Sequence, residues 1–367
     1  MSLQLGILGL PNSGKSTLFN ALTRAGAAVA AYPFTTIEPN VGVAVLTDPW
    51  LTKLVEMVQP ERVVPAAVEF VDIAGLVRGA HQGEGLGNQF LGHIRTVDAI
   101  VMVARCFEDM DVPHPYGQVD PVVDLEVLEL ELALADMATV DRRIGKMQQE
   151  TKALPRDRRG EAARLDSLEE LRAALGRGRP AVDWAREKGE MDWVQSLGLL
   201  TSKPRLYVAN SAEEDLPDGG ELADRVRAHA GTRGEVVIIS AKTEMDLQDW
   251  PTDEAELYLK ELGVTATGLD RLVAAGFRLL DLITFFTITG GKEVRAWPIP
   301  RNTAAPTAAG KVHTDMERGF IRAEVITVEK LLDAGSWGAA REAGQIRVEG
   351  RDYLVQDRDV IHFRFAV

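Results

Sequence analysis

The residues near the N-terminus have the types and spacing of a triphosphate-binding loop. The segment GLPNSGKST, residues 9–17, places Gly-x-x-x-x-Gly-Lys-Ser between an apolar run and the helical pattern TLFNALTRA. Gly9 and Gly14 let backbone N–H groups converge on phosphates, and the N-terminus of the following helix favours negative charge. Lys15 can reach the β- and γ-phosphates, where it would act in catalysis, and the Ser16 hydroxyl can bind Mg²⁺. The predicted nucleotide contacts of this P-loop are Asn12, Ser13, Gly14, Lys15, Ser16 and Thr17.

A second group of residues suits the metal ion and the γ-phosphate. Asp72 ends the apolar run EFVD, where its carboxylate can hold Mg²⁺ through water, and Gly75 can offer its N–H to the γ-phosphate. The segment YPFTTIEPNVG carries adjacent hydroxyls at Thr35 and Thr36, which suit a switch that closes on the metal. We predict Thr36 as the second protein ligand of Mg²⁺.

Two later strands are expected to deliver the residues that bind the base. RLYVAN leads to Asn210, Ser211, Ala212 and Glu213, and VVIIS leads to Ser240, Ala241 and Lys242. At the place of residues 210–213, guanine-specific switch proteins carry Asn-Lys-x-Asp, and the Asp accepts hydrogen bonds from two guanine N–H groups. Here Ser211 replaces the lysine and Glu213 moves the carboxylate by one methylene. Strict guanine selection is therefore expected to be lost, because a site rejects a base strongly only when its polar groups would stay unpaired.

The composition is that of a globular chain with two or three domains. The 367 residues are 46% hydrophobic and 26% charged, and no apolar run approaches the roughly 20 residues that cross a bilayer. The apolar N-terminus has no basic leader, so we expect a buried strand there and no signal peptide. The single Cys106 fits a packed thiol in a reducing, cytoplasmic compartment. The formal net charge, 41 − 55 = −14, disfavours a surface coated by nucleic acid.

The elements that position these residues follow an α/β pattern. Short runs rich in Val, Ile and Leu alternate with helical patterns, which predicts a mostly parallel sheet with crossover helices. Strands are expected at residues 3–8, 41–46, 67–71, 99–105, 205–209 and 236–239. The predicted nucleotide-binding domain comprises residues 1–124 and 200–282.

An inserted helical arm is expected at residues 125–199. Leu125, Leu128, Leu132 and Ala135 recur at spacings of three and four, which predicts that two antiparallel helices pair along this apolar seam in a coiled-coil arrangement. The tip is rich in basic residues, which suggests either a solvated hairpin tip or a contact with RNA phosphates. These basic residues are Arg142, Arg143, Lys146, Lys152, Arg156, Arg158, Arg159 and Arg164.

A β-rich module follows at residues 283–367, where strand patterns alternate with Gly and Asp turns. It is predicted to be a separate small α+β domain. Its basic and aromatic positions could follow an RNA backbone, but Trp297 and Phe320 lie in strand patterns, where core packing is the commoner role. The set comprises Arg295, Trp297, His313, Arg318, Phe320, Arg322, Arg347 and Arg351.

Several long motifs in order resemble the YchF family of Obg-like ATPases, within the translation-factor class of P-loop proteins. They include GLPNSGKST, YPFTTIEPNVG, DIAGLVRGAHQGEGLGNQFL, YVANSAEED and AAGKVHTDMERGFIRAE. The resemblance implies ATP bound and hydrolysed at least as well as GTP, with Mg²⁺ at Ser16 and Thr36, and association with the ribosome and its RNA. It also implies that the C-terminal module is a TGS domain with a β-grasp, ubiquitin-like fold.

The residue that places the attacking water is less clearly marked. Leu76 stands where Ras-like enzymes carry a water-orienting glutamine, and an aliphatic side chain cannot do this. His114 matches a histidine proposed for that role in the family, and His81 is the competing candidate. We favour His114, although a histidine between prolines is more typical of a surface loop. The glycines of this switch, Gly79, Gly83, Gly85 and Gly87, predict a segment that nucleotide or partner orders.

Other functions remain compatible with these motifs. Asn12 gives the loop the form in which an asparagine helps hold K⁺ beside the phosphates, or it forms a hydrogen bond within the loop. The main alternative to an ATPase switch in translation or stress response is a GTP-dependent nucleic-acid-binding protein in which hydrolysis is secondary. A small-molecule kinase is disfavoured, since no acceptor-site motif is evident.

Overall fold

The computed structural model describes residues 3–28, 40–73, 86–153 and 158–366. They fall in two compact units, one containing residues 3–21, 40–42, 70–73, 86–153 and 158–269 and the other containing residues 22–28, 43–69 and 270–366. This division differs from the predicted boundaries, because residues 43–69 and 270–282 group with the C-terminal module. Several predicted residues lie outside the described part of the chain, namely Thr35, Thr36, Gly75, Leu76, Gly79, His81, Gly83, Gly85, Lys152 (side chain only) and Arg156.

The first unit is built on a six-stranded sheet of order β2-β4-β1-β5-β6-β7. Its central strands pair in parallel, β1 with β5, β5 with β6 and β6 with β7. Every residue of β5 and β6 is buried, as expected for parallel strands covered on both faces. The strands are β1 (Gln4–Gly9), β2 (Val41–Val45), β4 (Ala67–Asp72), β5 (Ala99–Cys106), β6 (Arg205–Ser211) and β7 (Val236–Ile239), which confirms the predicted mostly parallel sheet.

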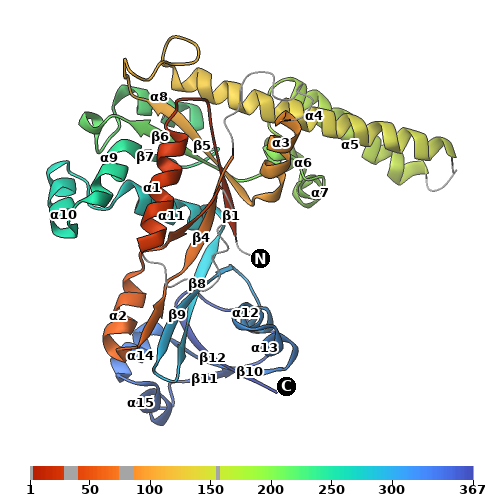
Figure 1. The fold of residues 1–367 in the computed structure, drawn as a ribbon. Helices are drawn as coiled ribbons and strands as arrows, with labels where there is room; N and C mark the ends of the chain where they lie inside the picture. Colours follow the sequence, from red (N-terminus) through yellow and green to blue (C-terminus); the bar gives the residue numbers. More distant parts are fainter. Residues whose placement is uncertain (1–2, 29–39, 74–85, 154–157, 367) are drawn as a thin grey trace. The chain divides into compact units, whose positions relative to one another are not determined.

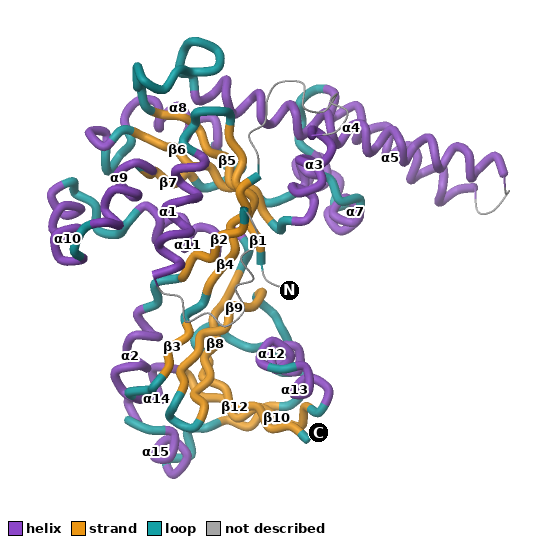
Figure 2. The backbone as a smooth tube through the Cα atoms, viewed as in Figure 1, coloured by secondary structure: helices purple, strands orange, loops and turns teal. Residues whose placement is uncertain are grey.

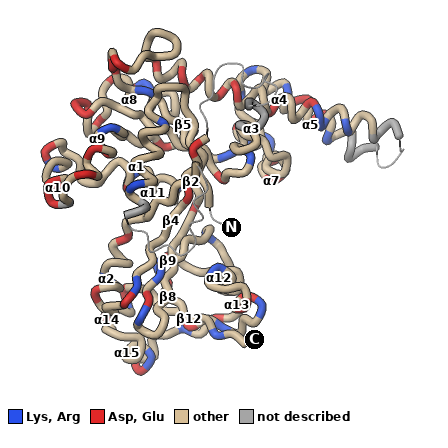
Figure 3. Tube along the Cα trace, viewed as in Figure 1, with Lys and Arg blue, Asp and Glu red and all other residues tan. Residues whose placement is uncertain are grey.

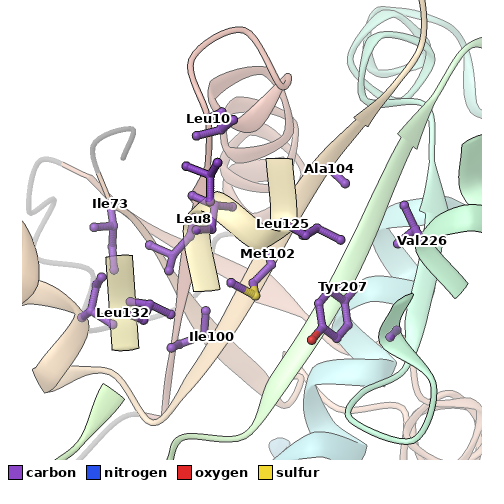
Figure 4. Close-up of a cluster of buried hydrophobic side chains, with 14 of the residues drawn as sticks. Leu8, Leu10, Ile73, Ile100, Met102, Ala104, Leu125, Leu132, Tyr207 and Val226 are labelled. Atoms are coloured by element: carbon purple, nitrogen blue, oxygen red, sulfur yellow. The ribbon is translucent and has the colours of Figure 1, made fainter. Parts of the chain in front are cut away.

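Helices of the first unit cover this sheet and frame its loops (Figure 1). Apolar side chains of β1, β5 and β6 pack with those of α4 and α8 in one buried cluster, drawn in Figure 4. Further helices continue from the carboxyl ends of the strands or link them. Their bounds are α1 (Lys15–Ala28, in this unit up to residue 21), α3 (Leu86–Thr96), α4 (Pro121–Ala153), α8 (Gly220–Ala230), α9 (Ala241–Asp246) and α10 (Thr252–Glu261), with short 3-10 turns at Leu200–Ser202, Glu213–Asp215 and Leu247–Asp249. Helix α11 (Gly268–Leu279) groups with the second unit from residue 270 onward.

The helical arm consists of α4 and α5 (Arg158–Gly176), followed by α6 (Ala181–Lys188) and α7 (Met191–Ser196). Helix α4 has 33 residues, so it extends about 50 Å at 1.5 Å per residue. Arg172 pairs with Asp141, whereas Gly176 lies against Met137. Partners that move in opposite directions along the chain make α4 and α5 antiparallel, as predicted.

The predicted seam between these two helices is wrong. Leu125, Leu128, Leu132 and Ala135 are buried, but they pack against the sheet and α8 instead of α5. The contact with α5 begins further along α4, at Met137, and continues where Val140 joins a cluster with Leu168 and Leu171. A helix of this length has room for two successive partners, so its first half completes the sheet's core and its second half forms the arm.

A buried carboxylate fixes the arm to the first unit. Asp136 of α4 accepts hydrogen bonds from the backbone N–H of Leu200 (2.7 Å), the N–H of Thr201 (2.8 Å) and the Thr201 hydroxyl (2.7 Å). Burial raises the pKa of Asp136, while these three donors oppose that shift. The arm therefore joins the sheet through specific polar contacts as well as apolar packing.

The second unit is α+β, as predicted for the C-terminal module. Its sheet has the order β11-β10-β12-β8-β9-β3, with β8 and β9 antiparallel and β8 and β12 parallel (Figure 2). Its strands are β3 (Arg62–Val64), β8 (Leu282–Thr289), β9 (Glu293–Pro300), β10 (Phe320–Thr327), β11 (Arg347–Glu349) and β12 (Asp359–Phe365), and its helices are α2 (Pro49–Val58), α12 (Ala305–Val312), α13 (Thr314–Arg318), α14 (Val328–Ala334) and α15 (Trp337–Glu342).

The second unit also recruits a strand that the sequence pattern did not reveal. Residues Arg62–Val64 pair in parallel with β9, opposite Glu293, Val294 and Arg295. Three residues are too few to show an alternating pattern, and the partner lies more than 200 residues away. Among the described helices, none combines the length and the apolar character needed to cross a membrane.

Candidate functional site

A cavity of about 890 Å³ opens where the parallel strands of the first unit end. Loops following β1, β5, β6 and β7 line it, which is the edge where open α/β sheets bind ligands. Its volume suits a nucleotide, since small-molecule sites span about 300–1,000 Å³. The lining residues are Leu10, Pro11, Asn12, Gly14, Lys15, Ser16, Thr17, Phe107, Glu108, Asp109, Val112, Asn210, Ser211, Ala212, Glu213, Glu214, Ser240, Ala241, Lys242, Thr243 and Asp246.

The P-loop has the backbone conformation that its glycines allow. Gly14 has φ of +86°, and a Cβ atom there would lie 2.0 Å from Nδ2 of Asn210. A Cβ at Gly9 would lie 2.5 Å from the Ser13 hydroxyl oxygen. Both positions therefore need glycine. Gly14 needs it because its backbone is left-handed and Asn210 lies close, and Gly9 needs it because a side chain would have no space. Helix α1 starts at Lys15, so its first N–H groups face the loop.

The metal-binding candidates fit a Mg²⁺ ion shared with phosphate. Ser16 is exposed and lines the cavity, and Asp72 ends β4, as predicted, where it forms an ion pair with Lys15. Among the described residues, no cluster of three His, Cys, Asp or Glu forms a metal cage. Mg²⁺ typically uses one or two protein oxygens together with substrate phosphates and water, so Ser16 and Asp72 are of the ligand type that could hold it.

Asn210 fastens the P-loop to the loop that follows β7. Its Nδ2 donates to the Ser13 carbonyl at 2.9 Å, and its Oδ1 accepts from the Ala241 N–H at 2.9 Å. Asn210 is only 4% exposed, so these bonds are shielded from water. The predicted base-binding residue is thus also the residue that holds two walls of the cavity at a fixed distance.

The remaining base-binding candidates meet at the same end of the cavity. Glu213, Ser240, Ala241 and Lys242 all line it, together with Ser211 and Ala212. The Ser211 hydroxyl donates to the Gly219 carbonyl at 3.2 Å, so its side chain is used within the fold. The structure therefore gathers Asn210 and Glu213 from one loop with residues 240–242 from another, as the sequence predicted.

Arg105 is the main site residue that the sequence reasoning missed. It is the last residue but one of β5 and is 2% exposed, and its guanidinium donates to the carbonyls of Val112 (2.6 Å) and Phe107 (3.2 Å). A longer contact of 3.4 Å reaches the Asn12 carbonyl in the P-loop. Its position near the end of an apolar strand was the available signal, because a buried arginine requires several acceptors. Arg105 shapes residues 107–112, which form one wall of the cavity.

His114 lies beyond this wall and is not among the cavity-lining residues. Its side chain is 4% exposed, with Nε2 at 3.0 Å from Oδ2 of Asp124 and Nδ1 accepting from the Tyr116 N–H at 3.2 Å. This arrangement makes Nδ1 the acceptor and places the proton on Nε2. Burial raises the pKa of Asp124, and the hydrogen bond from His114 opposes that shift. In this conformation both ring nitrogens are engaged by Asp124 and Tyr116, and His114 does not face the cavity.

A similar connection joins the same wall to the P-loop. The Asn12 side chain donates from Nδ2 to the Pro113 carbonyl at 2.9 Å, and Asn12 has φ of +65°. The hydrogen bond thus leaves the P-loop, whereas the sequence suggested one within it. The residue directly before His114 is therefore linked to the phosphate-binding loop.

The basic residues expected to contact RNA have mixed surroundings. Arg142 and Arg143 are exposed on α4, and Figure 3 marks basic residues along α4 and α5. Arg164 pairs with Glu190 at 2.8 Å and lies over the Trp193 ring. For Arg158 and Arg159 the structure describes the backbone of α5 only.

In the second unit, Arg322 is exposed and Arg295 stacks on Trp297 at 3.8 Å. Trp297 and Phe320 belong to the apolar cluster of that unit, where Trp297 also donates to the Thr287 hydroxyl at 2.9 Å. Both aromatic residues therefore serve core packing, which the strand patterns favoured.

Comparison with known proteins extends over the whole chain. Residues 4–149 match the family model MMR_HSR1, described as a 50S ribosome-binding GTPase, and residues 282–366 match YchF-GTPase_C, described as a protein of unknown function. The chain is 48% identical to the ribosome-binding ATPase YchF of Bacillus subtilis (strain 168) and 47% identical to that of Escherichia coli O157:H7, each alignment covering 100% of both chains.

A solved structure shares the fold as well. The chain is 33% identical to the YchF GTPase of Schizosaccharomyces pombe, with a TM-score of 0.87. The match covers 99% of this chain and 98% of that one. The fold of this chain, including its P-loop unit, is therefore also found in a solved structure over nearly the full length of both chains.

Proposed function

Because the chain belongs to the YchF family of P-loop nucleotide hydrolases, we propose that it binds and hydrolyses ATP, and also GTP, with Mg²⁺. We further propose that it acts on the ribosome in the cytoplasm as a nucleotide-dependent switch in translation or stress response. The observation that carries the proposal is the cavity where Lys15, Ser16, Asn210 and Glu213 converge at the carboxyl ends of the strands.

The phosphate end of this cavity would hold the triphosphate and the metal. Backbone N–H groups of residues 12–17 would surround the phosphates, and Lys15 would exchange its bond to Asp72 for the β- and γ-phosphates. Ser16 and Asp72, the latter through water, would hold Mg²⁺ together with Thr36, and Gly75 would contact the γ-phosphate. When bound, Mg²⁺ neutralises charge that develops on the transferred phosphoryl group.

His114 is our candidate for the residue that positions the attacking water, with His81 as its competitor. Since His114 now bonds to Asp124, it would have to rotate or move with residues 107–118 to reach the γ-phosphate. In single-turnover ATP hydrolysis, His114→Ala is expected to slow the chemical step with nucleotide binding unchanged. An unaltered single-turnover rate would exclude His114.

A monovalent cation beside the phosphates is a further part of the proposal. Asn12 lines the cavity, and its Nδ2 is already bonded to Pro113, so its oxygen would be the atom available to K⁺. We expect faster ATP turnover in KCl than in NaCl at equal ionic strength. Equal rates would remove K⁺ from the mechanism.

Ribosome association is supported by the names of the relatives and by the exposed basic residues. Arg142, Arg143, Arg156, Arg158 and Arg159 of the arm are our candidates for contact with ribosomal RNA, with Arg295 and Arg322 in the second unit. Charge-reversal of arm arginines is expected to weaken ribosome binding most strongly at low salt, because phosphate contacts are salt-dependent.

The deciding experiment measures ATP and GTP turnover with and without 70S ribosomes. Calorimetry with the wild-type protein and Mg²⁺ is expected to detect both nucleotides, and Lys15→Ala serves as the hydrolysis-deficient control. Well-folded protein that binds neither triphosphate would refute the nucleotide assignment. Binding with turnover that never responds to ribosomes would refute the ribosomal assignment alone.

A further inference from the structure

The carboxylate that replaces the guanine-reading aspartate has two unexpected partners. Tyr258 of α10 donates its hydroxyl to Oε1 of Glu213 at 2.7 Å, and the Thr243 hydroxyl lies 2.8 Å from Oε2. Each carboxylate oxygen of Glu213 therefore already accepts a hydrogen bond from the protein. Tyr258 lies outside the sequence motifs that predicted the site, and Thr243 directly follows the predicted residues 240–242 but was given no role.

We propose that Thr243 and Tyr258 are specificity-positioning residues, which occupy the carboxylate of Glu213 and so weaken the preference of the site for guanine over adenine. The inference rests on the proposed function, because it concerns the base of the same nucleotide. According to this inference, the base preference of the Asn-x-x-Glu motif depends on the hydrogen-bond partners of the glutamate as well as on the length of its side chain.

The chemistry of the two bases gives the reason. Guanine presents two neighbouring donors, N1–H and the N2 amino group, whereas adenine presents an N6 amino donor beside the N1 acceptor. An ionised carboxylate accepts hydrogen bonds and donates none, so an unoccupied one favours guanine. The two hydroxyl groups take up two of the about four lone-pair sites of the carboxylate and fix its orientation. Guanine must therefore compete with them for well-aligned acceptors, while adenine loses less.

The surroundings of Thr243 fix the direction of its bond. Thr243 is 5% exposed, and its hydroxyl lies 2.9 Å from the Ser240 hydroxyl as well as near Glu213. A hydroxyl has a single proton to donate. Donation to the charged carboxylate is the stronger choice, so Thr243 accepts from Ser240. Ser240, Thr243 and Glu213 thus form a directed chain along the cavity wall.

Tyr258 is held in place from the other side. The Trp250 ring packs against it with centroids 5.2 Å apart. The hydrogen bond to Glu213 raises the pKa of Tyr258, so the phenol remains a donor at neutral pH. Because α10 lies outside the loops that form the phosphate site, substitution of Tyr258 can change base preference and leave the triphosphate contacts intact.

The test compares nucleotide affinities of variants that remove each hydroxyl. Wild type, Tyr258→Phe, Thr243→Val and the double variant are titrated by calorimetry with the Mg²⁺ complexes of the β,γ-imido analogues of ATP, GTP and ITP. The ratio Kd(GTP)/Kd(ATP) is expected to fall about threefold in each single variant and about tenfold in the double variant. ITP lacks the N2 amino group, so its gain is expected to be smaller than that of GTP.

Two controls separate positioning from general damage. Thr243→Ser keeps a hydroxyl and is expected to keep the wild-type ratio, and Thr265→Val makes the same Thr-to-Val change at an exposed position and is expected to be neutral. If Thr243→Val does not fold, Tyr258→Phe decides alone. If wild-type protein binds ATP and Tyr258→Phe keeps the ratio Kd(GTP)/Kd(ATP) within twofold of wild type, this inference is overturned and the proposed function is unaffected. Wild-type protein that binds no nucleotide overturns both.

Discussion

Substitution of Asn210 by alanine tests whether the cavity depends on a clamp between its two walls. The change removes the bonds to the Ser13 carbonyl and the Ala241 N–H, each 2.9 Å long and buried. A net hydrogen bond contributes about 1 kcal/mol, and a buried group left without a partner costs about 1–3 kcal/mol. Two buried groups lose their partner, so at about 1.5 kcal/mol for each group we expect a total loss of about 3 kcal/mol.

This loss is expected to divide between stability and binding. If half of this free-energy loss destabilises the unliganded protein, the cost is about 1.5 kcal/mol. This cost lowers Tm by roughly 3–6 °C for a unit of this size. The other half is needed to order the two loops around nucleotide, which weakens Mg²⁺–ATP binding about tenfold. Thermal unfolding without nucleotide and calorimetric titration of the same samples measure the two parts separately.

Asn20→Ala is the matched control for Asn210→Ala. Asn20 is exposed on α1, so its loss is expected to change Tm by less than about 1 °C and ATP affinity by less than twofold. The reasoning is refuted if Asn210→Ala also keeps wild-type Tm and affinity. The two bonds would then contribute nothing to holding the P-loop.

Three further predictions concern other buried polar groups. Asp136→Ala leaves three donors without an acceptor, so denaturant unfolding is expected to show a free energy of unfolding lower by about 3 kcal/mol. Asp141→Ala, in an exposed ion pair of the same helix, is expected to lower it by under about 1 kcal/mol, and equal losses would contradict the role of Asp136 as an anchor. Burial raises the pKa of Cys106 to about 12, and the thiolate is the form that reacts with iodoacetamide. At pH 8 the native protein is therefore expected to be labelled at least ~100-fold more slowly than the unfolded protein, and fast labelling of the native protein would show that the thiol is accessible. Asp124→Ala releases the His114 ring and is expected to raise intrinsic ATP turnover severalfold, an effect that disappears when His114→Ala is added; the same acceleration in both backgrounds would argue against the link.

Local patterns were enough to predict the P-loop and the sheet. A glycine-rich turn between an apolar strand and a helix places Gly14 and Lys15 whatever the rest of the chain does, and the six predicted strands all occur within two residues of their expected ends. The candidate base-binding residues could be expected to lie together because they directly follow strands whose carboxyl ends share one edge. Each of these inferences uses residues that are near one another in the chain.

Tertiary structure decided which partner each of these residues meets. The periodicity of α4 predicted an apolar face, but only the packing showed that Leu125 and Leu132 cover the sheet while Val140 contacts α5. The clamp of Asn210 on Ser13 joins residues 197 positions apart, and Tyr258 reaches Glu213 across 45.

The sequence by itself determined that this chain carries a P-loop and a mostly parallel sheet, and it marked Asn-x-x-Glu as the candidate base-binding motif. The structure alone decided that Arg105 shapes the cavity wall, that His114 is held by Asp124 and that Glu213 is occupied by two hydroxyl groups. The physical reason is that turn geometry and periodicity are set by neighbouring residues, whereas a hydrogen bond between distant segments depends on how the whole chain packs.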